Sequence, residues 1–362
     1  MATHFRTLKI KDIRKETADC VSVSFEIPEE WKKEFQFKQG QNITIRTTLE
    51  GEEIRRSYSI CSSPLDQELR IAVKKIPNGK FSSYANQMLK KNILMEVLPP
   101  TGQFFTELNP TSKKNYLAFA AGSGITPIIS IIKTALAVEK QSSFTLVYGN
   151  RTHQSIIFKE ELEALKNYYM DRFSIHYVFS REKTEASVNH GRIDAAKCSE
   201  LFKKLIDLQN IDEFFICGPE EMIFSLKTWL DSQEVEKKKI HFELFTVPGQ
   251  GSEKIKLTEE KEKNKVTGKS KITVRLDGIS FDFGLSYNEE PILDAALKQG
   301  ADLPFACKGG VCATCKAKLI SGKVEMDNNY ALEPEELEAG FILTCQSHPI
   351  TEQVIVDFDL RH

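Results

Sequence analysis

Four of the eight cysteines in this 362-residue chain lie close together near its C-terminus, and their spacing constrains the fold more than any other feature. Cys307, Cys312 and Cys315 share one loop, PFACKGGVCATC, and 29 residues separate the third from Cys345. The other four cysteines are scattered along the chain. This density predicts that the four thiolates converge on one inorganic group.

The cysteine loop has the composition that close approach to such a group requires. Gly309 and Gly310 allow a tight turn because glycine accepts positive φ at little cost, and small neighbours let backbone N–H groups reach the sulfurs. The spacing C-x4-C-x2-C-x29-C resembles that of plant-type ferredoxins, which hold a 2Fe–2S cluster. Structural zinc is the alternative, but four-cysteine zinc sites usually show two short C-x2–4-C knuckles.

Composition excludes several classes of protein. The chain has 49 Lys and Arg against 51 Asp and Glu, so it is not a highly basic nucleic-acid binder. No stretch approaches the roughly 20 apolar residues of a membrane helix, and the N-terminal segment MATHFRTLKIKD has no apolar signal region. Cysteines without a secretory signal indicate a reducing compartment. We therefore expect a cytoplasmic protein that binds neither nucleic acid nor membrane.

Hydrophobic patterning predicts three domains. Alternating apolar residues separated by glycine turns over residues 1–110 indicate an antiparallel β-barrel. Residues 111–245 alternate short apolar strands with amphipathic helices, which indicates an α/β domain with a parallel sheet. Residues 246–270 are rich in Lys and Glu and predict a linker. Residues 271–362 predict a small α+β domain, for which the resemblance of the cysteine spacing to ferredoxins implies a β-grasp ferredoxin fold.

More detailed predictions follow from the same patterns. Asp277-Gly278 predicts a hairpin turn, and residues 288–300 predict a helix with Pro291 near its start. In the α/β domain, the predicted strands are 116–121, 144–149, 173–179 and 213–218, followed by helices over 127–139, 158–169, 194–205 and 219–230.

A glycine turn after the first parallel strand predicts a nucleotide site. Glycines at this position let a pyrophosphate approach the backbone, and the following helix N-terminus supplies free N–H groups. Thr126 is a candidate N-cap and Pro127 a candidate first helical residue. Ligands of open α/β sheets bind beyond the carboxyl ends of the strands, where three segments qualify. They are Gly122, Gly124, Thr126 and Pro127; Ser180 and Arg181; and Cys217, Gly218 and Pro219.

Arg181 bears on the choice of cofactor. Its guanidinium could clamp a ribose 2′-phosphate, which favours NADPH over NADH, while the alternative is a solvated loop arginine. Asn150-Arg151 is another candidate phosphate contact.

The strand IRRSYSI in the predicted barrel suggests a flavin site. Arg56 and Tyr58 project from one face of the strand, where a guanidinium suits a pyrophosphate and an aromatic ring suits stacking on a flavin. Ser59 is placed to donate to a flavin nitrogen. Gly79-Lys80-Phe81-Ser82 offers a second glycine turn that opens a helix. The alternatives are an ordinary strand and an ordinary helix cap.

The order of these motifs resembles the ferredoxin–NADP reductase superfamily fused to a C-terminal plant-type ferredoxin, as in reductase components of bacterial oxygenases. The segments GEEIRRSYSIC, AAGSGITP, YGNRT, HGRID, FICGP, ADLPFACKGGVCATCKAKLISGKV and LEPEEL are most similar to the phenylacetyl-CoA epoxidase reductase family. The resemblance implies FAD at Arg56, Tyr58, Ser59, Val73, Lys74, Gly79, Phe81, Ser82, Thr126 and Phe245, with Glu243 near the flavin. It implies a nicotinamide framed by Gly122, Thr126, Cys217, Gly218 and Pro219, and catalytic roles for Ser59, Thr126 and Cys217.

The implied activity is electron transfer from NADPH, or NADH, through FAD and a 2Fe–2S cluster to a di-iron oxygenase. The ferredoxin segment 271–362 has 8 Lys and Arg against 15 Asp and Glu, so it carries −7, and the rest of the chain carries +5 because the whole carries −2. This complementarity favours docking within the chain. The alternatives are a reductase for another oxygenase and a non-catalytic 2Fe–2S carrier or redox sensor.

Overall fold

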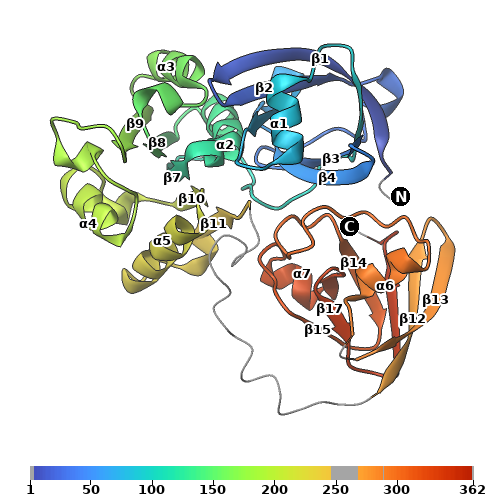
Figure 1. Ribbon diagram of the computed structural model, residues 1–362. Helices are drawn as coiled ribbons and strands as arrows, with labels where there is room; N and C mark the ends of the chain where they lie inside the picture. The colour runs from blue at the N-terminus through green and yellow to red at the C-terminus, as the bar shows by residue number, and fades with distance from the viewer. Residues whose placement is uncertain (1–3, 246–267, 288, 361–362) are drawn as a thin grey trace.

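The computed structural model describes residues 4–245, 268–287 and 289–360. Three sheets organise these residues into a barrel, a parallel-sheet domain and a smaller C-terminal domain (Figure 1). Most of the predicted linker lies outside the described residues. The first strand of the C-terminal domain begins at Lys269, two residues before the predicted boundary.

The N-terminal sheet has six strands in the order β4-β3-β6-β1-β2-β5, and every pairing is antiparallel, as predicted. A bridge between Ile60 and Ile71 brings the ends of β4 and β5 together, so the sheet closes into a barrel around alternating apolar side chains. The elements are β1 (Arg6–Thr17), β2 (Cys20–Glu26), β3 (Asn42–Leu49), β4 (Glu52–Ser59), β5 (Leu69–Lys74), α1 (Lys80–Gln87) and β6 (Leu94–Val97).

The second sheet is parallel throughout, with the strand order β11-β10-β7-β8-β9. Four of its strands match the predicted ones, whereas β11 was not predicted. The elements are β7 (Asn115–Ala121), α2 (Ile125–Val138), β8 (Ser143–Asn150), α3 (Lys159–Tyr168), β9 (Phe173–Phe179), α4 (Ala195–Lys204), β10 (Glu213–Cys217), α5 (Glu220–Ser232) and β11 (Ile240–Glu243).

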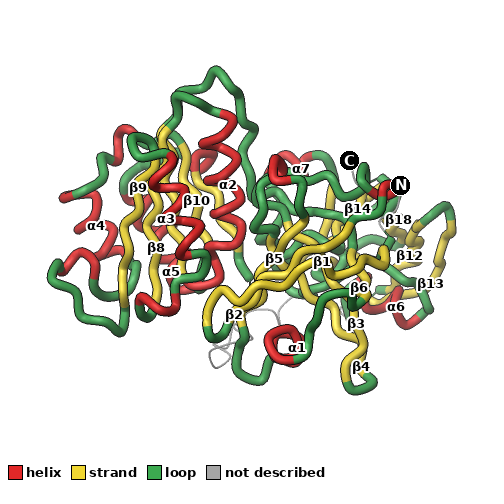
Figure 2. Tube along the Cα trace, turned by 90° about the horizontal axis from the view of Figure 1, so that it is seen from above, coloured by secondary structure: helices red, strands yellow, loops and turns green. Residues whose placement is uncertain are grey.

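Helices cover both faces of this sheet (Figures 1 and 2). Side chains of α2 and α3 pack with Tyr116, Ala118 and Ala120 in one core, while α4 and α5 pack on the opposite face with Leu117 and Phe119. The strand order reverses at β7, because β8 lies on one side of it and β10 on the other. Ligands of doubly wound sheets bind at this switch point.

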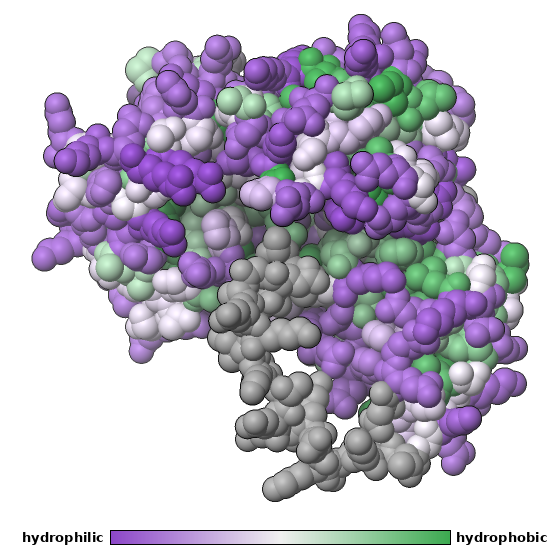
Figure 3. Space-filling view, viewed as in Figure 1, coloured by the Kyte–Doolittle hydropathy of each residue, from purple (hydrophilic) through white to green (hydrophobic). Residues whose placement is uncertain are grey.

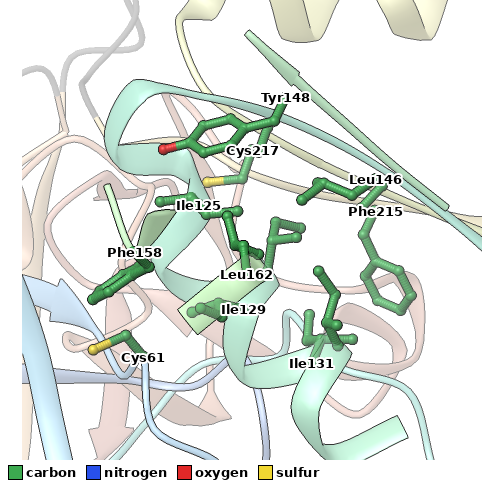
Figure 4. Close-up of a cluster of buried hydrophobic side chains, with 14 of the residues drawn as sticks. Cys61, Ile125, Ile129, Ile131, Leu146, Tyr148, Phe158, Leu162, Phe215 and Cys217 are labelled. Carbon is green, nitrogen blue, oxygen red and sulfur yellow. The ribbon is translucent and has the colours of Figure 1, made fainter. Parts of the chain in front are cut away.

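Helix α2 also joins the parallel-sheet domain to the barrel. Its Ser130 Oγ donates to the Ser62 carbonyl at 2.6 Å, and Thr134 shares a 2.9 Å hydrogen bond with Ser63. The barrel cysteine Cys61 belongs to the same apolar cluster as Ile125, Ile129 and other α2 residues (Figure 4). These contacts fix α2 relative to the barrel along most of its length.

The C-terminal domain has a mixed five-stranded sheet in the order β13-β12-β18-β14-β16 and a separate β15–β17 pair. Asp277 and Gly278 both have positive φ, which a tight β12–β13 hairpin requires. Helix α6 is shorter than predicted, because Pro291 is its N-cap rather than a residue inside it. The elements are β12 (Lys269–Leu276), β13 (Ile279–Ser286), α6 (Ile292–Lys298), β14 (Lys316–Ser321), β15 (Val324–Met326), α7 (Pro334–Glu338), β16 (Phe341–Leu343), β17 (Ser347–Pro349) and β18 (Gln353–Asp357).

Hydrophilic side chains cover most of the face shown in Figure 3. Within the described ranges, no helix is both long enough and apolar enough to cross a membrane.

Candidate functional site

The glycine turn after β7 lies at the switch point. Gly122 has a φ of +54°, and the Tyr148 hydroxyl donates to its carbonyl at 2.9 Å. A Cβ at Gly124 would stand 2.0 Å from the Cys217 carbonyl oxygen, so only glycine fits where this turn meets the end of β10. Tyr148, Cys217 and Ile125 lie together at the N-terminal end of α2 (Figure 4).

The predicted capping roles of Thr126 and Pro127 are wrong. A 3-10 turn over Gly122–Gly124 runs directly into α2, so the helix begins at Ile125 and its N-cap is Gly124. Thr126 lies inside the first helical turn, where its Oγ1 donates back to the Ser123 carbonyl at 3.0 Å. Both residues are buried at the turn, so they remain part of the candidate site.

The end of β10 lies against the glycine turn that follows β7, on the other side of the switch point. Cys217 is fully buried, and burial, then the charge of Glu243, raises the pKa of its thiol well above the ordinary value. Gly218 packs against Ala121, and Pro219 is the N-cap of α5. The predicted residues of the two loops are therefore brought together.

Ser180 and Arg181 lie at the same edge of the sheet but farther from the glycine turn, because β8 separates β9 from β7. Their backbone N–H groups donate to the carbonyls of Asn150 and Arg151, each at 2.9 Å. The side chains of Arg151 and Arg181 are exposed. Two arginines thus follow adjacent strands, which is the arrangement a phosphate on the outer part of a nucleotide requires.

The barrel supplies the predicted flavin residues from β4, β5 and α1. The rings of Tyr58 and Phe81 are 5.5 Å apart, and Ser82 Oγ accepts from the Ile76 N–H at 3.3 Å, which closes the turn before α1. Lys74 faces the glycine turn, since its Nζ lies 3.7 Å from where a Cβ at Gly122 would stand. Val73 differs from the others because its side chain is fully buried in the barrel core.

Alternation along β4 sends its two arginines to opposite faces. Ile54 and Tyr58 pack toward the barrel core, and Arg56 lies on their face with an exposed side chain. Arg55 and Ser59 point the other way, and both are buried. Ser59 is thus separated from Arg56 and faces the carboxyl end of the parallel sheet.

Ser59 Oγ donates to Oε2 of Glu243 at 2.9 Å. Glu243 ends β11 and pairs in register with Cys217, so Ser59, Cys217 and Glu243 meet where the barrel joins the parallel sheet. Burial raises the pKa of Glu243 to about 8, although the bond from Ser59 opposes the shift. Phe245, two residues later, is 40% exposed.

A cavity of about 40 Å³ opens beside Glu243. This volume accommodates one or two water molecules. Asn42 also lines it, and the Asn42 Oδ1 atom is buried without a hydrogen-bond partner in the described part of the chain. Asn42 was not predicted from the sequence, because the cavity that it lines is formed by residues of different domains. Cys312 of the C-terminal domain also lines this cavity.

Three of the four clustered cysteines are buried, and Cys307 is partly exposed. A hydrogen bond with Cys307 lowers the pKa of the Cys345 thiol. A hydrogen bond with Cys315 and burial outweigh this effect, so the pKa of Cys345 is raised overall. A bond with Cys307 and burial raise the pKa of Cys312. The four thiols therefore form one contiguous group.

Backbone geometry in this loop differs partly from expectation. Positive φ occurs at Lys308, Gly310 and Ala313 rather than at both predicted glycines. The Gly309 N–H instead donates to Cys307 Sγ at 3.3 Å. Four contiguous thiols, with a backbone donor at Cys307, fit a 2Fe–2S cluster, which takes four cysteine ligands.

Comparisons with known proteins agree with this geometry. The FAD-binding domain of oxidoreductases matches residues 7–105, the oxidoreductase NAD-binding domain matches residues 119–228, and the 2Fe-2S iron-sulfur cluster binding domain matches residues 275–349. The chain is 44% identical to one of the subunits of 1,2-phenylacetyl-CoA epoxidase from Escherichia coli, over 99% of each protein. It belongs to the family of oxygenase reductase components.

A further relative and a solved structure are also similar to this chain. The ferredoxin reductase component of 3-ketosteroid-9-alpha-monooxygenase from Rhodococcus rhodochrous is 32% identical over 97% of this chain and 96% of its own length. The crystal structure of phthalate dioxygenase reductase has the same fold, with a TM-score of 0.58 and 22% identity over 98% of each chain. The relatives serve oxygenases, which implies an oxygenase partner for this reductase.

In this reductase the cysteine loop lies where all three domains meet. Val311 packs into the apolar core of the NAD-binding domain, and Cys307 and Tyr330 pack against it. On the barrel side, Thr44 Oγ1 lies 3.2 Å from Thr314 Oγ1. The ferredoxin domain is therefore docked with its cysteine loop toward Ser59 and Glu243.

Proposed function

We propose that this reductase takes electrons from NADPH and delivers them to a di-iron oxygenase that epoxidises phenylacetyl-CoA. The observation that carries the proposal is the 44% identity over 99% of the chain to a protein named as a subunit of that epoxidase. When bound, the three cofactors supply the redox chemistry: a nicotinamide donates a hydride, a flavin releases the electron pair singly, and a 2Fe–2S cluster carries one electron at a time.

The residues of the chain would hold and orient these groups. Arg56, Lys74 and the turn before α1 would bind the FAD pyrophosphate, with Tyr58 and Phe81 beside the flavin ring. The residues that follow β7 and β10 would hold the nicotinamide against that ring. Ser59, Thr126 and Cys217 would set the distance over which the hydride moves.

Glu243 would keep a proton close to the flavin. Its carboxyl accepts from Ser59, and burial raises its pKa to about 8, so it is protonated at neutral pH. The adjacent cavity gives water access to this carboxyl. The arrangement supports Glu243 as the group through which the proton balance of flavin reduction is maintained.

Cys307, Cys312, Cys315 and Cys345 would be the cluster ligands. All eight cysteines are free thiols rather than disulfides, which supports a reducing compartment such as the cytoplasm. The donor preference for NADPH rests on the exposed arginines at the ends of β8 and β9.

Reconstitution with the epoxidase subunits of the same organism tests the proposal. We expect NADPH-dependent epoxidation of phenylacetyl-CoA only when the reductase, loaded with FAD and iron, is present. A reductase that reduces an artificial acceptor but neither binds these subunits nor supports turnover would belong to another oxygenase, such as one acting on steroids. A protein that oxidises no NAD(P)H at all would support the carrier or sensor alternative.

A further inference from the structure

Arg55 on β4 reaches from the barrel into the ferredoxin domain. Its Nη1 donates to the Leu303 carbonyl at 3.0 Å, and its Nη2 donates to Asp302 Oδ1 at 3.0 Å. Nε is held by Glu53 of the same strand at 2.8 Å. The side chain is only 7% exposed, so most of its hydrogen-bonding capacity is satisfied within the docked domains.

Aromatic rings enclose the same guanidinium. The Phe305 ring of the ferredoxin domain lies 4.2 Å from the Arg55 Cζ, and the Phe5 ring of the barrel lies 5.2 Å from it. Arg46 reinforces the contact, since it stacks on Phe5 at 4.0 Å and approaches Asp302 at 3.4 Å. A planar cation that donates to a carboxylate and a carbonyl while stacking on rings is a use that lysine cannot reproduce.

The anchored segment leads directly into the cysteine loop. Residues 302–305 end two positions before Cys307, while the Thr44–Thr314 hydrogen bond holds the far end of the loop. The loop is therefore attached to the barrel on both sides of Cys312. Of these two attachments, the one at Asp302 carries charge, and Arg55 makes its shorter ion pair, at 3.0 Å against 3.4 Å for Arg46.

We propose that Arg55 is a positioning residue that docks the ferredoxin domain in the arrangement from which the cluster is reduced. The inference deepens the proposed function and rests on its electron route. Arg55 faces away from the barrel core, toward which Tyr58 points, and its side-chain hydrogen bonds go to Glu53, Asp302 and Leu303 rather than to a candidate flavin or nicotinamide residue.

Replacement of Arg55 by alanine or glutamine tests the proposal in the full-length, cofactor-loaded protein. We expect the docking equilibrium constant to fall by about 10- to 100-fold, because a hydrogen bond to a charged group contributes the equivalent of that change. In stopped-flow mixing with NADPH, flavin bleaching should keep its rate, whereas the later absorbance change of the cluster should slow. Hydrogen exchange over residues 301–306 should quicken in the same samples, independently of activity.

Two further variants separate positioning from a general structural effect. Arg14→Ala is the matched control, because Arg14 on β1 is 62% exposed and pairs with Asp12 of its own domain. In Arg55→Lys, the absorbance change of the cluster should be faster than in Arg55→Ala but slower than in the wild type. Asp302→Asn should slow the cluster step less in the Arg55→Gln background than in the wild type, since the two side chains interact.

The outcomes are distinguishable from failure of the proposed function. If the wild-type protein reduces neither flavin nor cluster with NADPH, the electron route is wrong. If the wild type reduces both, and Arg55→Ala changes neither the cluster rate nor hydrogen exchange at 301–306, the docking role is wrong. Loss of bound FAD in Arg55→Ala, with slowed flavin bleaching, would likewise overturn it, because Arg55 would then act on the flavin site.

Discussion

Ser59 on the barrel and Glu243 on the last parallel strand share a 2.9 Å hydrogen bond across 184 residues of sequence. The bond lowers the pKa of Glu243 against a larger rise caused by burial, and the balance is about 8. The two domains thus set the protonation of one carboxyl at their junction.

Ser59→Ala should move the pH dependence of flavin reduction upward. Loss of the donor removes the one contact that lowers the Glu243 pKa, so we expect a shift of about one pH unit in the rate of flavin bleaching by NADPH. Glu243→Gln should abolish the pH dependence near 8. A Ser59→Ala profile identical to that of the wild type would show that the carboxyl does not govern this step.

Cys312→Ser should separate the two redox functions. Reduction of a one-electron protein acceptor such as cytochrome c should be lost, because a ligand of the cluster is removed. Ferricyanide reduction by the flavin should remain, since Cys312 belongs to another domain. Cys198→Ala, which changes a buried cysteine of α4, should retain both activities. Loss of both activities in Cys312→Ser with FAD retained would contradict separate modules.

Arg181→Ala should raise the KM for NADPH more than that for NADH. A guanidinium hydrogen bond to a phosphate contributes about 1.5–3 kcal/mol, so we expect a rise of tenfold or more for NADPH. Lys166→Ala on α3 makes the same charge change at an exposed site away from the strand ends. Equal effects on both nucleotides would remove Arg181 from a 2′-phosphate site, and the same assay on Arg151→Ala would then probe the neighbouring strand end.

Gly124→Ala should destabilise the NAD-binding domain by about 1–3 kcal/mol, because the added methyl group would stand 2.0 Å from the Cys217 carbonyl. The KM for NADPH should rise as the two loops separate. Fluorescence of Trp229 in a Trp31→Phe background measures unfolding of this domain, since the chain has two tryptophans. Gly284→Ala in β13 of the ferredoxin domain, where a Cβ meets no atom within 4 Å, should leave the Trp229 transition unchanged. An unfolding free energy in Gly124→Ala equal to that of the wild type would refute the steric argument.

Glu213→Gln should flatten the acid dependence of stability. Burial alone would raise the pKa of Glu213, but hydrogen bonds from His241 and Lys114 lower it to about 2. The folded protein therefore holds this carboxylate charged where the unfolded chain protonates it, so its stabilisation is complete above pH 4.5 and is lost as the pH falls toward 2. The contribution is on the order of 2–3 kcal/mol.

Urea unfolding followed by Trp229 fluorescence at several pH values measures how steeply the free energy of unfolding falls as the pH is lowered. Glu163→Gln provides the control, because Glu163 is 56% exposed on α3. An unchanged slope in Glu213→Gln would mean that the ion-paired carboxylate does not dominate the acid response of this domain.

The sequence predicted the features that depend on local pattern. Alternation and turn residues identified the barrel, four parallel strands and the Asp277-Gly278 hairpin, because these signals lie within a few residues. The helix predicted over 127–139 begins earlier, at Ile125, because a 3-10 turn leads directly into it. The helix predicted over 288–300 begins later, at Ile292, because Pro291 is its N-cap. Strand β11 was missed because four residues, two of them polar, carry little pattern.

The candidate site was predicted as a set of motifs but not as an arrangement. Arg55 and Arg56 are chemically identical neighbours, and which of them meets another domain depends on what covers each face of β4. The segment Asp302–Phe305, which packs on Arg55, lies about 250 residues later in the sequence. No local signal therefore distinguishes the two arginines. Asn42 was missed for the same reason, because its cavity exists only where three domains meet.

Cys312 is buried where the domains meet, and Cys315 and Cys345 are buried in the core of the ferredoxin domain, which has a consequence for the loss of electrons to dioxygen. An oxygenase system works in the presence of dissolved dioxygen, which would intercept electrons from an open carrier. Val311 and Thr314, on either side of Cys312, contact the other two domains, so an oxygenase would reach this side of the loop only after the ferredoxin domain detaches. Turnover by that route would be limited by how often the domain detaches, however fast the flavin is reduced.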